Sequence, residues 1–255
     1  MNEFGIDTAF EWKIDPTSAR KSELSYALPR LGTIGYGGIT TDRWYNKPLN
    51  ADSGFLPTIQ NMQAAGKPVG CYIFSYAWDT NSALHEADKA CNLLDSLGVS
   101  LELPVFFDWE EDSFNRAVAA GVRVTPNLVK QMTSTFMNYV RTRGRRAGWY
   151  SNKDFCERFY DGATRELWRF KENNIFWYAE WGISQPQLDC DVWQFDGTYQ
   201  NHDVFWNGIR CDKNYVRNER FFDGKPIPPP HTKIPVWLLA HLTADVERSY
   251  KSHVI

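Results

Sequence analysis

The sequence predicts an α/β fold, an irregular (β/α) barrel of mostly parallel strands. Short segments rich in β-branched and aromatic residues alternate with longer segments whose apolar residues recur at helical spacing, and glycines and prolines separate them. Such alternation gives a parallel sheet with right-handed crossovers. About eight strands within roughly 220 residues are enough to close a barrel. The helix signals weaken late in the chain, so the barrel is expected to be irregular there.

Seven segments have the composition of buried strands. They are residues 4–7, 33–38, 68–77, 104–110, 147–151, 175–181 and 191–195. Asp212 follows the last strand-like segment.

Three segments have helical periodicity. The first covers residues 55–66 and stops at a glycine. The second follows a cap at Asn81 or Ser82 and ends at Gly98. The third opens at Thr125-Pro126, a capping residue followed by proline. Its expected inner face is Leu128, Met132, Phe136 and Tyr139. The stretch between residues 10 and 30 has only an uncertain helix.

Composition limits the classes of function. At 255 residues the chain suits a single α/β barrel, and 43% hydrophobic residues are ample for its core. A net charge of -3 and the lack of a long basic run argue against nucleic-acid binding. Five dispersed cysteines, an odd number without C-x-x-C spacing, predict reduced thiols rather than disulfides or a zinc site. His85 and His202 are expected to be structural or surface residues, so no metal and no cofactor is predicted.

The N-terminal residues have neither a basic segment nor an apolar segment of the secretory type. No run is long and apolar enough to cross a membrane. The sequence therefore predicts synthesis in a cytoplasm without membrane insertion.

The segment at residues 104–110 carries the most chemical information. Its apolar residues lead directly into Asp108 and Glu110, which share one face of an extended chain with Trp109 between them. Two neighbouring acids and a water-excluding aromatic raise a carboxyl pKa and can produce a proton donor near neutral pH. Such a pair is the equipment for cleaving a glycosidic bond. The alternative interpretation is a pair of solvated acids beyond a strand end.

Other acids and aromatics are expected at the same end of the barrel. Active sites of such barrels lie where the carboxyl ends of the strands converge. Asp7, Glu180 and Asp212 join the pair there. The aromatic candidates for sugar stacking are Tyr76, Trp109, Tyr150, Trp181 and Trp193. Core packing is the alternative for each aromatic alone, but several acids and aromatics at one rim are typical of a carbohydrate cleft.

The motifs resemble, in order, those of glycoside hydrolase family 25, the Chalaropsis-type lysozymes that include many phage endolysins. They include Gly5-Ile6-Asp7, the segment from Leu103 to Glu110, and Gly148-Trp149-Tyr150, and the likeness covers roughly residues 4–217. The resemblance implies the irregular barrel of that family. It implies Glu110 as the general acid and Asp7, Asp108 and Asp212 as the other active-site acids. A departure follows Asp7, where Thr8-Ala9-Phe10-Glu11-Trp12 replaces the usual Ser and His.

The activity implied by the resemblance is hydrolysis of peptidoglycan at the β-1,4 bond between N-acetylmuramic acid and N-acetylglucosamine. Either a carboxylate or the acetamido oxygen of the substrate would attack the sugar. The glycan strand is the expected partner. Because no secretory signal is visible, the resemblance favours a phage endolysin that reaches the wall after a separate protein has opened the membrane.

Three alternatives remain open. A chitinase-type glycosidase would carry two further acids, but those positions hold Leu103 and Phe106. A wall-binding module without catalysis would have little reason to keep four acids. A virion component carrying a lysozyme domain is the third alternative.

The C-terminal part differs in composition. The sequence predicts a catalytic domain at residues 1–224, then a Pro-rich linker and one short helix at residues 225–255. A single helix cannot bury an apolar face alone. The helix could dock on the barrel, self-associate or bind the wall. The alternative is a tail with no specific role.

Overall fold

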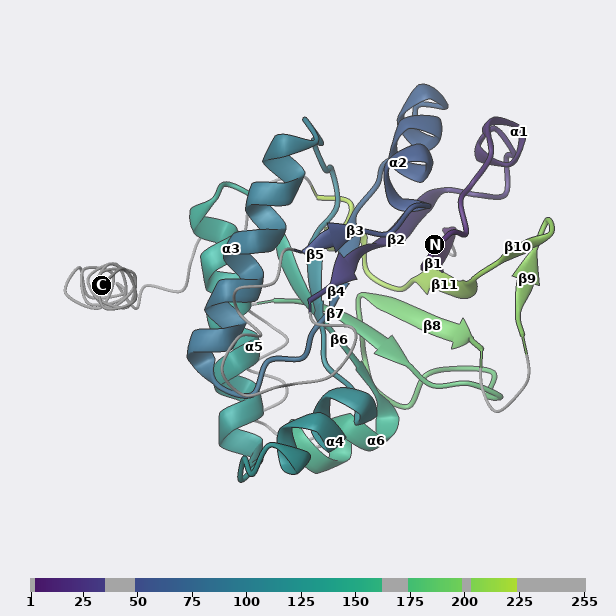
Figure 1. Ribbon diagram of the computed structural model, residues 1–255. Helices are drawn as coiled ribbons and strands as arrows, with labels where there is room; N and C mark the ends of the chain where they lie inside the picture. The colour runs from purple at the N-terminus through teal and green to yellow at the C-terminus, as the bar shows by residue number, and fades with distance from the viewer. Residues whose placement is uncertain (1–2, 35–48, 162–173, 199–202, 224–255) are drawn as a thin grey trace.

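The computed structural model describes residues 3–34, 49–161, 174–198 and 203–223. Within these residues, eight strands form a barrel in the order β1-β11-β8-β7-β6-β5-β4-β2, and β2 pairs with β1 to close it (Figure 1). The strands are β1 (Phe4–Thr8), β2 (Tyr26–Thr33), β4 (Cys71–Phe74), β5 (Val105–Asp108), β6 (Ala147–Asn152), β7 (Ile175–Ala179), β8 (Val192–Asp196) and β11 (Asp212–Val216). The predicted α/β barrel is confirmed.

Helices cover the outside of the barrel, and α3 and α5 pack side by side along one flank (Figure 1). The helices are α1 (Pro16–Ala19), α2 (Phe55–Ala64), α3 (Thr80–Ser96), α4 (Glu111–Ala119), α5 (Pro126–Thr142) and α6 (Lys153–Phe159). A short 3-10 helix lies at Glu219–Phe221. None of the helices in the described ranges is long and apolar enough to cross a membrane.

The C-terminal part of the barrel is irregular, as the weakening helix signals late in the sequence predict. The barrel strands β1, β2 and β4 to β8 run parallel. Strand β11 runs antiparallel to both of its neighbours, β8 and β1. The hairpin of β9 (Phe205–Trp206) and β10 (Ile209–Arg210) precedes it. An antiparallel strand needs no helical crossover, because it starts at the same edge of the sheet at which the preceding strand ended. The first residue of β11 therefore lies at the same rim as the last residues of the parallel strands.

The strands are buried on both faces, which explains their almost uninterrupted apolar runs. In β5, Val105 and Phe107 belong to the core under the helices, and Phe106 belongs to the core inside the barrel. The inner core is built around Trp177, whose ring makes edge-to-face contacts with Tyr72, Phe106 and Tyr150. The alternation also turns Asp108, two residues after Phe106, toward the barrel axis.

The second strand differs from its prediction. Residues 33–38 were expected to form it, but β2 spans Tyr26–Thr33, and residues 35–38 lie outside the described ranges. Pro29 argues against a strand in the sequence, because proline has no backbone N–H to donate to a neighbouring strand and is rare in central strands. It lies at the end of the pairing with β1, where the loss of one donor is tolerated. A further strand, β3 (Asn50–Ala51), pairs antiparallel with β2.

The helix caps are partly as predicted. Thr125 caps α5, with its hydroxyl accepting a hydrogen bond from Leu128 N at 3.2 Å. The cap of α3 is Asp79 rather than Asn81 or Ser82, because Ser82 instead completes a capping box with Asp79. The predicted inner face of α5 is rotated by one position: Met132 and Phe136 are buried as expected, but its other members are half-buried, and Val129, Met137 and Val140 complete the buried face.

The last described residues cover the end of the barrel at which the parallel strands begin. Arg146 donates hydrogen bonds to the carbonyl oxygens of Phe221 and Arg220, both at 2.7 Å, and the ring of Phe221 packs edge-on against Tyr26. All five cysteines are buried, and none of them forms a disulfide. The predicted boundary at residue 224, the tail helix and His202 lie outside the described residues, so the domain division stays a prediction.

Candidate active site

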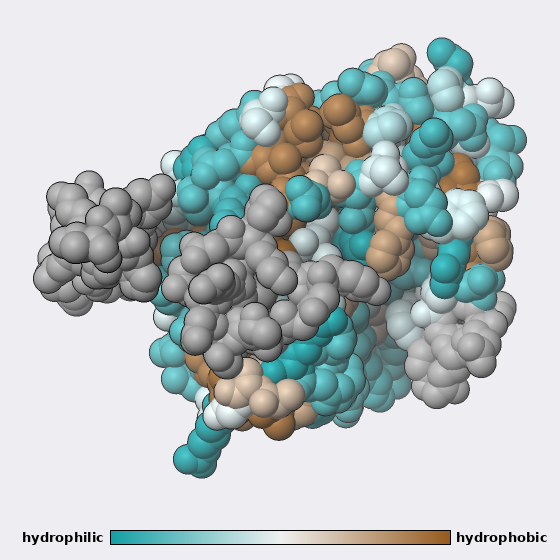
Figure 2. Space-filling model, in the orientation of Figure 1, coloured by the Kyte–Doolittle hydropathy of each residue, from teal (hydrophilic) through white to brown (hydrophobic). Residues whose placement is uncertain are grey.

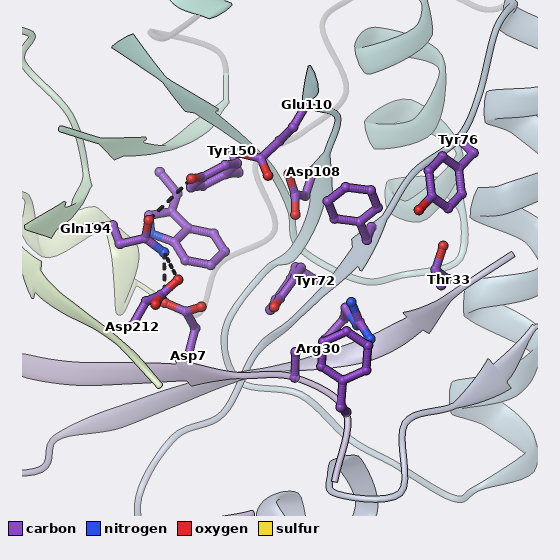
Figure 3. A pocket seen from close by; sticks show the side chains of 14 residues that line it. Asp7, Arg30, Thr33, Tyr72, Tyr76, Asp108, Glu110, Tyr150, Gln194 and Asp212 are labelled. Carbon is purple, nitrogen blue, oxygen red and sulfur yellow. Dashed lines mark hydrogen bonds between the residues drawn. The ribbon is translucent and has the colours of Figure 1, made fainter. Parts of the chain in front are cut away.

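A pocket of about 330 Å³ opens at the rim where the parallel strands end (Figure 3). This volume is within the range of small-molecule sites, roughly 300–1,000 Å³. The residues that line it come from loops and strands all around the barrel. They are Asp7, Ala9, Phe10, Arg30, Thr33, Tyr72, Phe74, Tyr76, Asp108, Glu110, Tyr150, Trp177, Gln194 and Asp212. On the face seen in Figure 2, the protein surface is mostly hydrophilic, with separate apolar patches.

The four predicted acids all line this pocket, and each is held by its own element. Asp108 is the last residue of β5, and Asp7 lies one residue before the end of β1. Asp212 opens β11 and lies directly opposite Asp7 in the antiparallel register. Side chains that face each other in such a pair are about 4.5–5.5 Å apart at their Cβ atoms, so the two carboxylates are neighbours.

Glu110 lies beyond the strand rather than within it, which corrects the predicted strand end. It is the N-cap residue of α4, with an extended backbone at φ -132° and ψ -165°. The Ser113 hydroxyl accepts a hydrogen bond from Glu110 N at 3.2 Å and donates to the Ser75 carbonyl at 2.6 Å. The turn after β5 is thereby tied to the turn after β4. Figure 3 shows the Glu110 and Asp108 side chains next to each other.

The amide side chains of Gln194 and Asn214 position Asp7 and Asp212. Gln194 Nε2 donates to Asp7 Oδ2 at 3.0 Å, and it lies 3.4 Å from Asp212 Oδ2 (Figure 3). Asn214 Nδ2 also donates to Asp7 Oδ2, at 2.8 Å. The Gln194 carbonyl accepts from the Tyr150 hydroxyl at 3.2 Å, so the orientation of its amide is fixed by partners on both sides.

Burial dominates the electrostatics of the pocket. It raises the pKa of Glu110 to about 7, with hydrogen bonds from Tyr150 and Asn152 opposing the shift and the charge of Asp212 adding to it. Burial likewise raises the pKa of Asp212 to about 6, opposed by hydrogen bonds from Thr198. A carboxyl with a pKa near neutrality can donate a proton under ordinary conditions.

The pKa values of Asp7 and Asp108 are raised well above the usual range. For Asp7 the causes are burial and the charge of Asp212. For Asp108 they are burial and the charge of Glu110, opposed by the positive charge of Arg30. Protons in such a cluster are shared among interacting groups, so the site holds fewer than four negative charges at neutral pH.

The structure brings together only some of the predicted substrate-binding residues. Tyr76 and Tyr150 line the pocket. Trp109 does not: its ring packs on Phe155 and Phe159, its Nε1 donates to the Ala77 carbonyl at 2.8 Å, and only 1% of it is exposed. A sugar ring cannot reach this side chain, so its predicted stacking role is wrong.

Three further candidates also lie away from the pocket lining. Trp193 is buried and donates to the Glu180 carbonyl at 2.8 Å. The Glu180 carboxylate accepts hydrogen bonds from Tyr178 and from Gln187 N. Trp181 donates to the Gln194 carbonyl at 3.3 Å and therefore supports the pocket from behind. None of the three lines the pocket, and their substrate-binding roles stay predictions.

Sequence reasoning missed several residues of the pocket. Gln194 and Arg30 are polar residues inside otherwise apolar strand segments, and that pattern is the signal that marks them. Arg30 is buried and pairs with Asp52 at 2.8 Å. Tyr72 and Trp177 are indistinguishable in sequence from core aromatics. Within the described ranges, no group of three His, Cys, Asp or Glu side chains is arranged to hold a metal ion.

Solved structures share this fold. The bacterial lysozyme from Streptomyces coelicolor has a TM-score of 0.63 and 17% identity, over 87% of this chain and 96% of that one. The family GH25 lysozyme from Aspergillus fumigatus has a TM-score of 0.62 and 16% identity, over 89% and 100%. The catalytic domain of endolysin ply40 from bacteriophage P40 of Listeria monocytogenes has a TM-score of 0.63 and 15% identity, over 88% and 98%.

Sequence comparison gives the family. No protein with a curated description matches the chain. The sequence pattern of Glycosyl hydrolases family 25 matches residues 49–204, more than half of the chain and a range that includes Asp108 and Glu110. With this match and the shared fold, the chain belongs to glycosyl hydrolases family 25 and is a glycoside hydrolase of the lysozyme type, a muramidase that hydrolyses peptidoglycan.

Proposed function

We propose that Glu110 is the general acid that cleaves the β-1,4 bond between N-acetylmuramic acid and N-acetylglucosamine in the bacterial cell wall. The observation that carries this proposal is the position of Glu110 in a pocket that three further acids line, where burial raises its pKa to about 7. Glu110 is half-buried, whereas Asp7 and Asp108 are buried. It is therefore the better placed to reach a leaving oxygen.

Glu110 first transfers its proton to the glycosidic oxygen, and the bond to the anomeric carbon breaks. In its ionised form Glu110 then takes a proton from the attacking water, and the site returns to its starting state. The pKa near neutrality suits both steps, because the group must be an acid in the first and a base in the second.

Asp108 favours the acetamido-assisted route over direct attack. Its Oδ1 is buried and has no hydrogen-bond partner among the described residues. A buried oxygen without a partner costs free energy, and an acetamido N–H of the substrate would satisfy it while its carbonyl oxygen attacks the anomeric carbon.

The biological setting in this proposal is that of a phage endolysin, made in a cytoplasm and released to the wall by a separate pore-forming protein. Two observations support it: the likeness to the catalytic domain of a phage endolysin, and five buried cysteines that form no disulfide, which suits a reducing compartment. Expression inside a bacterium with a susceptible wall should cause no lysis until the membrane is permeabilised. Lysis of intact cells during expression alone would contradict this setting.

The experiment for the catalytic proposal compares Glu110→Gln with Glu111→Gln. Both variants remove one carboxylate from neighbouring positions, but Glu111 points outward to an ion pair with Arg158. Loss of the general acid should lower the rate of wall clearance about 10²–10⁴-fold, and the Glu111 variant should keep nearly full activity. A folded Glu110→Gln protein with near-normal clearance would refute the assignment.

A further inference from the structure

Glu86 on α3 is a completely buried acid that takes no part in the proposed proton transfer and does not line the pocket. Its two carboxyl oxygens accept hydrogen bonds from the Ser75 hydroxyl and from Tyr76 N, the latter at 2.9 Å. Burial raises the pKa of Glu86 to about 8. An acid is rarely this buried unless its polar atoms have partners, and both of these partners belong to residues 75–77, the segment that follows β4.

Glu86 fixes the backbone of the 75–77 segment. Strand β4 ends at Phe74, and beyond it the backbone donors bond to side chains. Tyr76 N donates directly to Glu86, and Ala77 N donates at 3.1 Å to the Ser75 hydroxyl, which itself donates to Glu86. Two consecutive backbone donors therefore depend on one carboxyl, either directly or through a single hydroxyl.

The 75–77 segment holds the chain that leads into Glu110. Ser75 N donates to the Asp108 carbonyl at 2.7 Å. Trp109 Nε1 donates to the Ala77 carbonyl at 2.8 Å. The two residues that precede Glu110 are thus both hydrogen-bonded to the segment that Glu86 fixes.

The same segment holds the chain that follows Glu110. The Tyr76 hydroxyl donates to Asp112 Oδ2 at 2.7 Å, and the Ser113 hydroxyl donates to the Ser75 carbonyl at 2.6 Å. The Ser113 hydroxyl in turn accepts the hydrogen bond from Glu110 N. A displacement of the 75–77 segment would therefore shift the backbone of Glu110 from both sides.

We infer that Glu86 is a positioning residue for Glu110 and acts through the 75–77 segment without touching the substrate. This inference rests on the proposed function, because it takes Glu110 as the general acid, and extends it to the group that fixes the place of that acid. Proton transfer requires the acid to lie within hydrogen-bond reach of the leaving oxygen. A displacement of about 1 Å can lower the rate about 10²-fold, so a remote contact of this kind can control turnover.

The test compares Glu86→Leu with Glu86→Gln in the full-length protein, with soluble wall fragments as the substrate. Leucine keeps much of the side-chain volume but removes the acceptor of Tyr76 N and of the Ser75 hydroxyl. It should lower kcat about 10–10²-fold, with a smaller change in KM. Glutamine keeps a carbonyl acceptor for Tyr76 N and should restore most of the activity.

The pH profile separates positioning from stability. Burial is the largest cause of the raised pKa of Glu110, so a displaced and more hydrated Glu110 should lose its proton at lower pH. The alkaline limb of kcat should therefore move to lower pH in Glu86→Leu and return in Glu86→Gln. A smaller folded fraction alone would leave the limb in place. The control is Asp191→Asn, a buried acid that pairs with Arg220 where the parallel strands begin, and it should not move the limb.

A second variant covers the case in which Glu86→Leu does not fold. Ser75→Ala removes the hydroxyl that links Glu86 to Ala77 N and leaves the Glu86 carboxyl in place. It should move the alkaline limb in the same direction by a smaller amount. Circular dichroism at each pH of the assay shows that the variants are folded where their activity is measured.

Two outcomes would overturn the inference. An alkaline limb at the wild-type pH in folded Glu86→Leu, or in Ser75→Ala if the first variant is unfolded, would show that Glu86 only stabilises the fold. A rise in KM with kcat and the limb unchanged would show that the 75–77 segment serves Tyr76 at the pocket wall instead. Failure of the proposed function is distinguishable, because it would show as retained turnover by the Glu110→Gln protein, which either of these two outcomes leaves inactive.

Discussion

Asp7 and Asp212 lie directly opposite each other on the antiparallel strands β1 and β11, and the carboxylates of both accept hydrogen bonds from Gln194. The glutamine donor offsets the repulsion between two acids that burial has already made costly to ionise. Gln194 therefore holds the two carboxylates side by side at the rim of the pocket.

Replacing this donor with a third carboxylate should disrupt the pair. Gln194→Glu is expected to lower the free energy of unfolding by about 1–3 kcal/mol, because it removes a buried donor and adds a buried charge. The loss should grow as the pH rises and the new acid ionises. Denaturant unfolding at several pH values measures it. Gln131→Glu, on the exposed face of α5, is the control and should have little effect.

The pH profile of activity should report the proton on Glu110. Activity is expected to fall as the pH rises through about 7, where the general acid loses its proton. The charge of Asp212 raises the pKa of Glu110, so Asp212→Asn should move this alkaline limb to lower pH. Asp95→Asn removes a charge on α3 that pairs with Arg143 and Arg145, just beyond the end of α5, and it should leave the limb in place. A limb that stays fixed in Asp212→Asn would contradict the coupling.

Glu86 behind the pocket should make stability depend on pH. Burial raises its pKa to about 8, although Ser75 and Tyr76 N donate hydrogen bonds to it. A raised pKa means that the folded state binds the proton more tightly than the unfolded state, whose value is near 4.5. This contribution to stability is therefore complete below about pH 4.5 and is lost as the pH rises toward 8.

The variant Glu86→Gln should remove that part of the pH dependence. Its unfolding free energy, measured from pH 4.5 to 8, should change less with pH than that of the wild type. Glu157→Gln, at an exposed position of α6, serves as the control and should retain the wild-type slope. Parallel curves for wild type and Glu86→Gln would show that Glu86 is ionised in the folded protein.

Truncation tests the predicted domain boundary. Removal of the chain after Gly224 should leave a folded protein that cleaves small soluble wall fragments, because Arg146 binds the last turn at Arg220 and Phe221. Truncation after Val216 removes those two carbonyls and leaves the Arg146 guanidinium with the Glu102 carbonyl, so it should destabilise the barrel strongly. Circular dichroism melting compares the two. An unfolded protein after truncation at Gly224 would show that the tail belongs to the barrel.

The sequence predicts those parts of the fold whose local signals agree with the tertiary structure. The α5 helix is an example, because Thr125 and Pro126 carry the cap and the first turn. The β2 strand is missed because Pro29 and Gly32 contradict a strand locally, and only pairing with β1 and β4 stabilises it. The α4 and α6 helices are missed because they are short and begin directly after strand ends.

Some residues of the active site can likewise be predicted from the sequence, and others cannot. Acids at strand ends are visible in sequence, since a charge after an apolar run is unusual and the carboxyl ends of parallel strands meet. Aromatics are ambiguous because core and cleft use the same residues. Strand alternation could have excluded Trp109, which follows Asp108 and must face the opposite side. A polar residue inside an apolar strand marks Gln194, but its contacts with Asp7 on β1 and Asp212 on β11 are tertiary and cannot be predicted from the local sequence.

The identity of the cleaved bond tests the central claim most directly. Purified peptidoglycan is digested with the enzyme, the new reducing ends are reduced with borohydride, and the sugar alcohols are identified after hydrolysis. A muramidase that uses Glu110 as its acid should give N-acetylmuramitol as the main new product, and the Glu110→Gln protein should give almost none. N-acetylglucosaminitol as the main product would contradict the account, even if Glu110 proved essential.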